Sequence, residues 1–260
     1  PVLANLLEDK TTKETIIFAT DGYVALGEEY GPKSKITLEK LLNPAFSLQR
    51  RFDKNTSDQQ ERTKANAEVM TPAWVINKMV SHADAEWFGR PDVFNHQNED
   101  YTWTVVEERI EMPEGKTWQE YVESRRIEIT CGEAPYIVSR YDTTTGEGIS
   151  VYDRIGMLDR KLRIVNENTA TEEDWLEGTI RAFQSVYGFD WQGDNVLLAR
   201  ENLLLSYVDY YIARFKKEPD TDDLRSIAEI LSWNIWQMDG LSYCIPREKS
   251  EETPQAQLDL

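Results

Sequence analysis

The 260-residue chain contains few of the side chains that form disulfides or bind transition metals. Its two cysteines are Cys131 and Cys244, and it has two histidines. Two cysteines are too few for a disulfide framework, so we expect a reducing, cytoplasmic environment. With so few soft ligands, the sequence also argues against a zinc site.

Long apolar stretches are absent as well. No run of the chain approaches the roughly 20 apolar residues that span a bilayer, so we expect no membrane segment. The N-terminus has no basic region followed by an apolar one, so we expect no secretion signal. Hydrophobic residues still make up 40% of the chain, which suffices for one large α/β domain or for one domain with an added arm.

Basic residues are scarce relative to acidic ones. The chain has 29 lysines and arginines against 47 aspartates and glutamates, for a formal net charge of −18. Nucleic-acid binding depends on Lys and Arg clusters, so this charge indicates that another subunit holds DNA, that the chain does not bind it, or simply that the surface is solvated. The remaining basic clusters are candidate DNA contacts or solvated faces: Arg50-Arg51, Arg125-Arg126 and the run Arg154, Arg160, Lys161 and Arg163.

Composition and hydrophobic spacing divide the chain into three parts. Residues 1–65 are mixed and predict an N-terminal arm or helical region. Residues 66–246 predict the main domain, within which residues 143–170 are typical of an insertion. Residues 247–260 are charged and have no hydrophobic period, which predicts disorder.

Strand and helix patterns alternate from about residue 120 onwards. There are three strand candidates. The first begins at Ile127, the second ends at Asp190 and the third spans residues 233–238. This alternation predicts an α/β fold with a mostly parallel sheet and helices on both faces. Helices are predicted to begin at Thr71, Thr171, Asp194 and Thr221.

The most informative stretch is IEITCGEAPYI, residues 127–137. It predicts a short buried strand, a Cys-Gly turn and the start of a helix, an arrangement that brings backbone N–H groups close to a ligand. The stretch resembles the S-adenosylmethionine (SAM) loop of amino-group DNA methyltransferases, which has an acid, two residues, Cys-Gly, two small residues and an aromatic. The matching residues are Glu128, Cys131, Gly132, Glu133, Ala134 and Tyr136.

Three further segments resemble other parts of these methyltransferases and come in the family's order. In YGFDWQGDN, the resemblance implies that Asp190 accepts hydrogen bonds from the ribose hydroxyls and that Trp191 covers the adenine ring. In NIWQMDGL, it implies that Asp239 binds the adenine amino group. Before the loop, EVMTPAWVINKM resembles the segment in which Thr71 and Pro72 would close over the methionine end of the donor.

Over about residues 50–245, the chain thus resembles adenine-N6 DNA methyltransferases of restriction–modification systems, the group usually labelled restriction enzyme subunit M. The resemblance implies a Rossmann-like SAM-dependent methyltransferase fold, SAM as cofactor, DNA as substrate, and a restriction or specificity subunit as partner. The implied cofactor-binding residues are Thr71, Pro72, Glu128, Cys131, Gly132, Glu133, Asp190, Trp191 and Asp239.

The chain departs from the family at three points. Ala134 takes the place of the second loop glycine. Asp190 follows Gly132 by 58 residues, where a plain βαβ unit would place it about 20 residues on. The motif Asn/Asp-Pro-Pro-aromatic, which holds the flipped base, is expected after Asp239 and is absent there. The only similar string, NPAF at 43–46, precedes the Thr-Pro segment, so no catalytic residue is assigned.

Three functions stay open on this reading. The chain is a SAM-dependent adenine methyltransferase or its SAM-binding part, a catalytically inactive SAM-binding subunit, or an acidic interaction protein that mimics DNA. Simple structural roles also stay open: Asp190 and Asp239 as turn or capping acids, and Cys131 as a small buried residue. Near the end, Gln257, Leu258, Asp259 and Leu260 resemble the peptide by which bacterial proteins dock on the sliding clamp.

Overall fold

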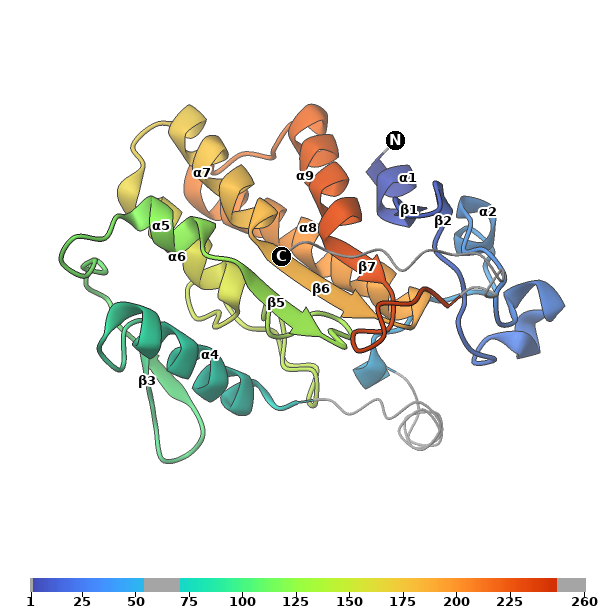
Figure 1. Cartoon of the computed structure of the whole chain (residues 1–260), viewed down its shortest axis with the longest axis horizontal. Coiled ribbons are helices and arrows are strands. Elements are labelled where there is room, and N and C mark those ends of the chain that lie inside the picture. The colour runs from blue at the N-terminus through green and yellow to red at the C-terminus, as the bar shows by residue number, and fades with distance from the viewer. Residues whose placement is uncertain (1, 54–70, 247–260) are drawn as a thin grey trace.

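The computed structural model describes residues 2–53 and 71–246. Predictions that fall on residues 54–70, or on residues 247–260 with their clamp-like peptide, lie outside the described residues. The described part is a mixed α/β structure that contains a three-stranded parallel sheet (Figure 1).

This sheet confirms the predicted parallel arrangement. β5 (Arg126–Ile129), β6 (Val186–Asp190) and β7 (Ile235–Gln237) pair in the order β5-β6-β7, and both pairs are parallel. The register places Gly188 of the central strand opposite Glu128. Because the strands are parallel, their carboxyl ends meet at one edge of the sheet.

The helices of the main part are α4 (Ala73–Phe88), α5 (Trp118–Glu123), α6 (Met157–Asn168), α7 (Glu172–Gln184), α8 (Gly193–Phe215) and α9 (Thr221–Asn234). Thr171 caps α7 as predicted, and its hydroxyl accepts a hydrogen bond from Asp174 N at 3.1 Å. The cap of α9 is Asp220, one residue before the predicted start. α8 begins at Gly193 without a side-chain cap, so the predicted cap Asp194 is wrong. The predicted starts are therefore close to the observed ones, and only Thr171 is the capping residue expected.

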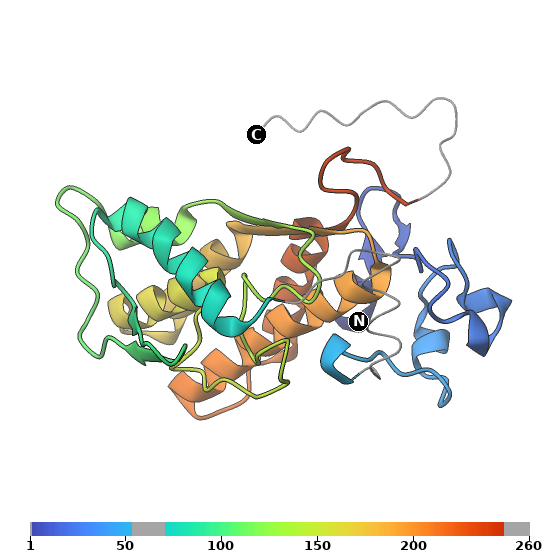
Figure 2. The same cartoon turned by 90° about the horizontal axis from the view of Figure 1, so that it is seen from below.

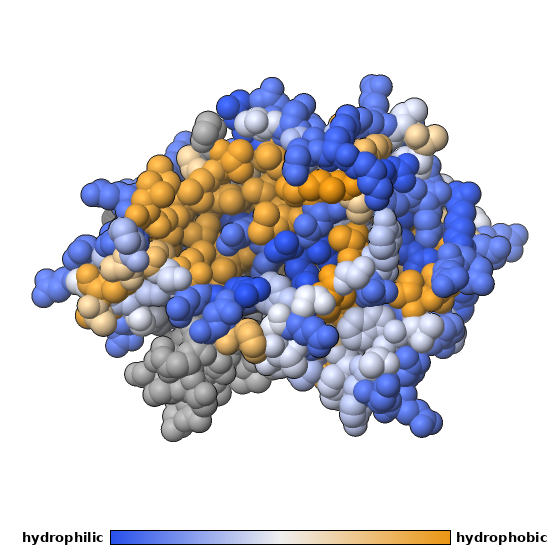
Figure 3. Space-filling model, turned by 180° about the vertical axis from the view of Figure 1, so that it is seen from behind, coloured by the Kyte–Doolittle hydropathy of each residue, from blue (hydrophilic) through white to orange (hydrophobic). Residues whose placement is uncertain are grey.

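The prediction of helices on both faces of the sheet is wrong for the described residues. α7, α8 and α9 pack against the sheet on one side, and Figure 2 shows α8 on the side away from the loop that follows β7. On the other side, Ile127 and Ile129 of β5 are 46% and 44% exposed. The reason is that α4 lies beside the sheet instead of over its second face (Figure 1). Figure 3 shows the molecule from behind, on the side opposite to the one seen in Figure 1, and apolar residues gather over part of that surface too.

Residues 143–170, which the sequence presents as an insertion, supply a central helix. The chain passes through turns after β5, so the helix start predicted there is wrong, and the next helix is α6. Leu158, Leu162 and Ile164 of α6 have no exposed surface. The sequence reading missed α6 although its apolar residues recur at helical spacing, and it did not foresee that charged side chains of this helix are buried too.

One of them, Arg160, finds its partners on a neighbouring helix. Arg160 of α6 donates to Asp84 at 2.7 Å and to Asn77 at 2.8 Å, and both acceptors belong to α4. Tyr121 of α5 donates to the other oxygen of Asp84 at 2.9 Å. A buried ion pair requires such added hydrogen bonds to offset its desolvation. The network fixes α4 and α5 against α6.

The N-terminal part lies beside the carboxyl ends of the sheet strands, and α1 packs on α9 (Figure 1). A separate hairpin, formed by β3 (Asn95–Gln97) and β4 (Trp103–Val105), packs beside α4. The elements of the N-terminal part are α1 (Val2–Leu7), β1 (Glu8–Asp9), β2 (Glu14–Thr15), η1 (Val24–Leu26), η2 (Glu28–Tyr30), α2 (Leu38–Leu41) and η3 (Arg51–Asp53).

Arg200 of α8 joins the N-terminal part to the sheet. Its side chain is buried. At the end of α1 it donates to the carbonyls of Leu6 and Glu8, at 2.7 and 2.8 Å. At the end of α9 it donates to the carbonyls of Ser232 and Ile235, at 3.3 and 2.7 Å. Carbonyls at helix C-termini carry partial negative charge, so two helix ends stabilise the guanidinium.

Replacing Arg200 with methionine should lower the free energy of unfolding by about 3 kcal/mol or more, because buried carbonyls would lose their donors. Urea unfolding followed by circular dichroism measures this change. Arg225→Met is the control, since the Arg225 side chain is 47% exposed, and it should shift stability by no more than about 0.5 kcal/mol. Equal effects of the two substitutions would contradict the role of Arg200.

Candidate functional site

The candidate site lies where β5 and β6 end, and it contains most of the residues predicted to bind a donor. The loop after β5 carries Cys131, Gly132 and Glu133, and the loop after β6 begins at Asp190. Main-chain pairing continues past the strand end, because Cys131 N donates to Phe189 O at 2.7 Å. The two loops therefore start side by side.

Asp190 connects these two loops directly. Its Oδ2 accepts a hydrogen bond from Gly132 N at 2.9 Å. Its Oδ1 accepts from Gln192 N at 2.8 Å and from Asn195 Nδ2 at 3.3 Å. The predicted ribose acid and the predicted Cys-Gly turn, 58 residues apart in sequence, thus form one unit.

Two buried carboxyl groups lie in this unit. Burial raises the pKa of Asp190 to about 6, although hydrogen bonds from Gln192 and Gly132 oppose the shift. Burial also raises the pKa of Glu128 well above its usual value, and the nearby Asp190 adds to this effect. Glu128 accepts a hydrogen bond from Ile137 N at 3.2 Å, so it also shapes the loop. Buried acids of this kind favour hydroxyl donors or cations as ligands and disfavour anions.

The loop itself has an unusual backbone. Thr130, Gly132 and Ala134 have φ angles of 58°, 55° and 61°. A left-handed residue with a side chain costs roughly 1–2 kcal/mol, so glycine would be favoured at Ala134, the position of the family's second loop glycine. Ala134 is fully buried. The loop therefore keeps the left-handed backbone at that position despite the added methyl group.

Cys131 has a packing role in this loop. Its side chain is 1% exposed, and burial raises the pKa of its thiol well above the usual value. Reactive cysteines are accessible and have lowered pKa values. The structure therefore supports the interpretation of Cys131 as a small buried residue.

Glu133 points into the protein. It is 2% exposed, and Tyr141 Oη donates to its carboxylate at 2.5 Å. Asn202 of α8 donates to both the main-chain oxygen of Glu133 and Tyr141 Oη, each at 3.0 Å. The Arg50 guanidinium lies 4.9 Å above the Tyr141 ring. This arrangement fixes both the side chain and the main-chain oxygen of the residue after Gly132.

The Thr-Pro segment is attached to the chain that follows the loop. Thr143 donates to Thr71 O at 3.2 Å, and Asp142 accepts from Ala73 N at 2.8 Å. Pro72 directly precedes the first residue of α4. Asp142 therefore caps this helix, where the sequence predicted Thr71. The segment reaches the site region by these contacts.

Asp239 and Trp191 occupy less specific positions. Asp239 Oδ1 accepts from Leu241 N at 2.8 Å and from Ser242 N at 2.7 Å. These bonds lower the pKa of Asp239 and show that it stabilises its own turn. Trp191 is 39% exposed beside Asp190. The binding of adenine by these two residues stays a prediction.

Gln237 is a residue of the site region that sequence reasoning missed. Its side-chain amide pairs with the main chain of Ile17, accepting from Ile17 N at 2.8 Å and donating to Ile17 O at 2.7 Å. A Cβ atom on Gly193 would lie only 2.1 Å from Ile17 O, so only glycine permits this approach. The N-terminal strand segment is thus held against the ends of β6 and β7. Gly193, in the WQGDN string, was the only residue in the sequence that hinted at this close approach of two chain segments.

The NPAF string is not a base pocket. Asn43 donates to Tyr30 Oη at 2.7 Å and accepts from Ala45 N at 3.0 Å. Phe46 stacks on Tyr30 with ring centroids 5.8 Å apart and is only 7% exposed. The string is a turn anchored in an aromatic cluster of the N-terminal part.

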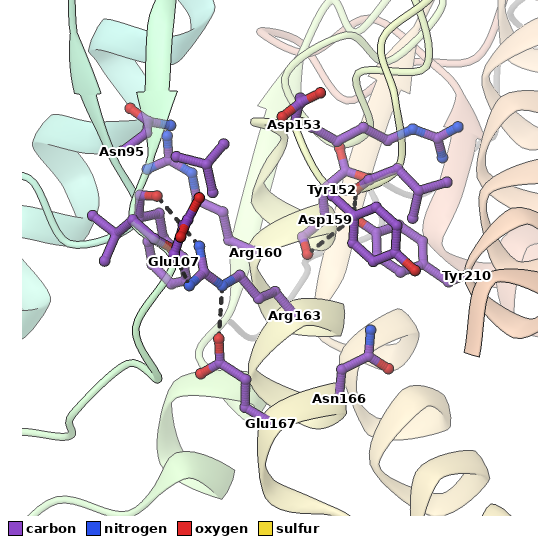
Figure 4. A pocket seen from close by; sticks show the side chains of 15 residues that line it. Asn95, Glu107, Tyr152, Asp153, Asp159, Arg160, Arg163, Asn166, Glu167 and Tyr210 are labelled. Carbon is purple, nitrogen blue, oxygen red and sulfur yellow. Dashed lines mark hydrogen bonds and ion pairs between the residues drawn. The ribbon is translucent and has the colours of Figure 1, made fainter.

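A cavity of about 440 Å³ lies elsewhere, between the β3–β4 hairpin, α6 and α8 (Figure 4). None of the predicted cofactor-binding residues lines it. Arg163 lies across it and binds Glu167 at 2.7 Å and Val106 O at 2.6 Å. Arg154, also in its wall, pairs with Asp209 at 2.6 Å. Together with the buried Arg160 and Lys161, these contacts show that the basic run faces inward and is not a DNA-binding surface.

Comparisons with family models, curated proteins and solved structures found no match to the chain. Among residues 2–53 and 71–246, no group of three or more His, Cys, Asp or Glu side chains is arranged to hold a metal ion. Within the same ranges, no helix is long and apolar enough to cross a membrane.

Asp190 should make the stability of the protein depend on pH. Its folded pKa of about 6 exceeds the usual Asp value of about 3.9, so the native state binds the proton more tightly. Stability present below about pH 4 is lost as the pH rises to about 6, by on the order of 2–3 kcal/mol. Asp190→Asn removes the titrating group.

Urea unfolding of both proteins across pH 4.5–7.5, a range around those values, measures this effect. The wild type should lose stability relative to the Asp190→Asn variant as the pH rises. Parallel curves for the two proteins would contradict the assigned environment of Asp190.

Proposed function

We propose that this chain is the SAM-binding part of a methyltransferase of the adenine-N6 DNA type. The observation that carries the proposal is the 2.9 Å hydrogen bond between Asp190 Oδ2 and Gly132 N. It joins an acid and a tight turn at the carboxyl ends of adjacent parallel strands, where α/β sheets bind their ligands. The sequence resemblance assigns these same two elements to SAM.

The chemistry of the residues fits this donor. SAM supplies a methyl group on a sulfonium, which is already activated. Asp190 Oδ2 accepts only one hydrogen bond from the described residues, and a carboxylate oxygen has room for a second, such as a ribose hydroxyl. Asp190 would also favour the positive charge of the donor over an anion.

DNA would be held by a partner. The chain has a net charge of −18, and the basic run of α6 and its preceding loop is engaged in internal ion pairs and carbonyl contacts. Phosphate binding needs accessible Lys and Arg side chains. A restriction or specificity subunit would therefore contribute the base pocket and the DNA surface, and this chain would position the donor.

A second candidate is an acidic interaction protein that mimics DNA, which the charge and the inward-facing basic run also favour. The two candidates differ in a direct way. A donor-binding part binds SAM and supports transfer of labelled methyl groups to DNA only with its partner. A mimic binds no SAM and competes with DNA for a basic protein.

Calorimetric titration with SAM tests the proposal, and the wild type should bind it. Asp190→Ala should weaken binding by about 1–3 kcal/mol, roughly 5- to 150-fold, because ribose hydroxyls would lose their acceptor. Asp222→Ala is the control, since the Asp222 side chain is 87% exposed on α9. Thermal melts verify that each variant is folded. Absence of wild-type binding at millimolar SAM would overturn the proposal.

A further inference from the structure

The open face of the sheet has the wrong polarity for a solvent-facing surface. In β5, Ile127 and Ile129 point to the open side and are 46% and 44% exposed, whereas Glu128 between them is 9% exposed and points to the helices. Successive strand residues alternate between faces, and a strand with one solvated face normally turns its polar residues outward. β5 does the reverse.

Neighbouring strands extend this apolar face. Ile127 lies opposite Tyr187, and Ile129 lies opposite Phe189. Phe189 in turn lies opposite Trp236, with ring centroids 6.1 Å apart. Residues paired in a parallel register point to the same side of the sheet. All five side chains therefore form one surface, which we call the open face, on the side turned toward the reader in Figure 1.

The loop after β7 covers one end of the open face, where its Gly240 lies against the Ile129 side chain. Tyr243 packs edge-on against Phe189 at 6.3 Å, which explains why Phe189 is only 6% exposed. Leu241 in the same loop is 89% exposed. Contiguous exposed apolar surface of this kind marks interaction sites.

The outer edge of β5 is also unpaired among the described residues. β5 pairs only with β6, and Arg126 N bonds to Ser185 O on that side. The main-chain groups of Ile127 and Ile129 alternate to the opposite side, toward the free edge. Thr130 Oγ1 donates to Ile129 O at 2.6 Å, and none of the described residues pairs with the N–H or C=O group of Ile127. A free apolar edge templates the addition of another strand.

We propose that the open face and the free edge of β5 bind a basic partner protein that adds a strand beside β5 and lays a helix over Ile127 and Ile129. Parallel sheets are covered by helices on both faces, and a strand followed by a crossover helix supplies both missing parts at once. The net charge of the chain, −18, favours a basic partner protein. Two copies of this acidic chain would repel each other, whereas a basic protein would be attracted. The inference rests on the geometry of the sheet and not on SAM binding.

The first test uses the isolated chain. Hydrogen exchange should be fast at the amides of Ile127 and Ile129 and slow at that of Phe189 in the central strand. Sedimentation velocity should show a monomer. Strong protection of both isoleucine amides in the monomer would overturn the proposal. A dimer that Ile127→Thr and Ile129→Thr dissociate would also overturn it, in favour of a second copy.

The second test uses the tagged full chain as bait in an extract of its source cells, followed by purification of the captured protein and recombination with the chain. The proposal expects a basic protein that protects the amides of Ile127 and Ile129 and binds more weakly as salt rises. The double variant Ile127→Thr, Ile129→Thr keeps β-branched side chains, and it should lose at least about tenfold in affinity.

Leu42→Thr is the matched control, because Leu42 is 71% exposed in the N-terminal part. It should bind the captured protein as the wild type does. Capture of no basic protein, unprotected β5 amides in the complex, or equal affinity of the double variant would each overturn the proposal. Calorimetry with SAM on the double variant keeps the two proposals apart, since its donor affinity should equal that of the wild type.

Discussion

The buried guanidinium of Arg200 is the constraint on which the arrangement of this protein depends. A charged group is costly to bury, and burial lowers the pKa of Arg200 to about 10 although the nearby Asp9 opposes the shift. It is tolerated because the carbonyl ends of α1 and α9 converge on it. Those contacts place the N-terminal part next to the ends of β6 and β7, where Gln237 then holds Ile17. The wall of the candidate site beside β6 thus depends on an interaction outside the site.

Capping residues and the alternation of strands and helices are local features of the sequence, and they predicted several elements of the fold. Thr171 caps α7 as expected, and the parallel pairing of β5, β6 and β7 followed from the alternation of strands and helices. α6 was missed although Leu158, Leu162 and Val165 recur at helical spacing; what the pattern could not show is that Arg160 and Lys161 are buried in it. Their partners lie far away in the sequence, as Asp84 shows, and no spacing rule identifies them.

The candidate site was predictable in its composition and not in its contacts. Asp190 and Gly132 meet as the order of motifs implied. The sequence did not show that Glu133 turns inward to Tyr141, or that Asp239 bonds to its own turn. Both depend on which donors the fold brings to each carboxylate. Ala134 illustrates the same limit, since its left-handed backbone is known only once the loop is built.

Electrostatics links stability to the kind of ligand this site prefers. Asp190 is ionised at neutral pH with its pKa held near 6 by burial, so the native protein retains a strain of on the order of 2–3 kcal/mol in that one charge. A cation or a hydroxyl donor placed beside the carboxylate would relieve part of this strain, and the relief would add to its affinity. An anion would increase the strain. The buried Asp190 carboxylate therefore favours a cation or a hydroxyl donor over an anion as its neighbour.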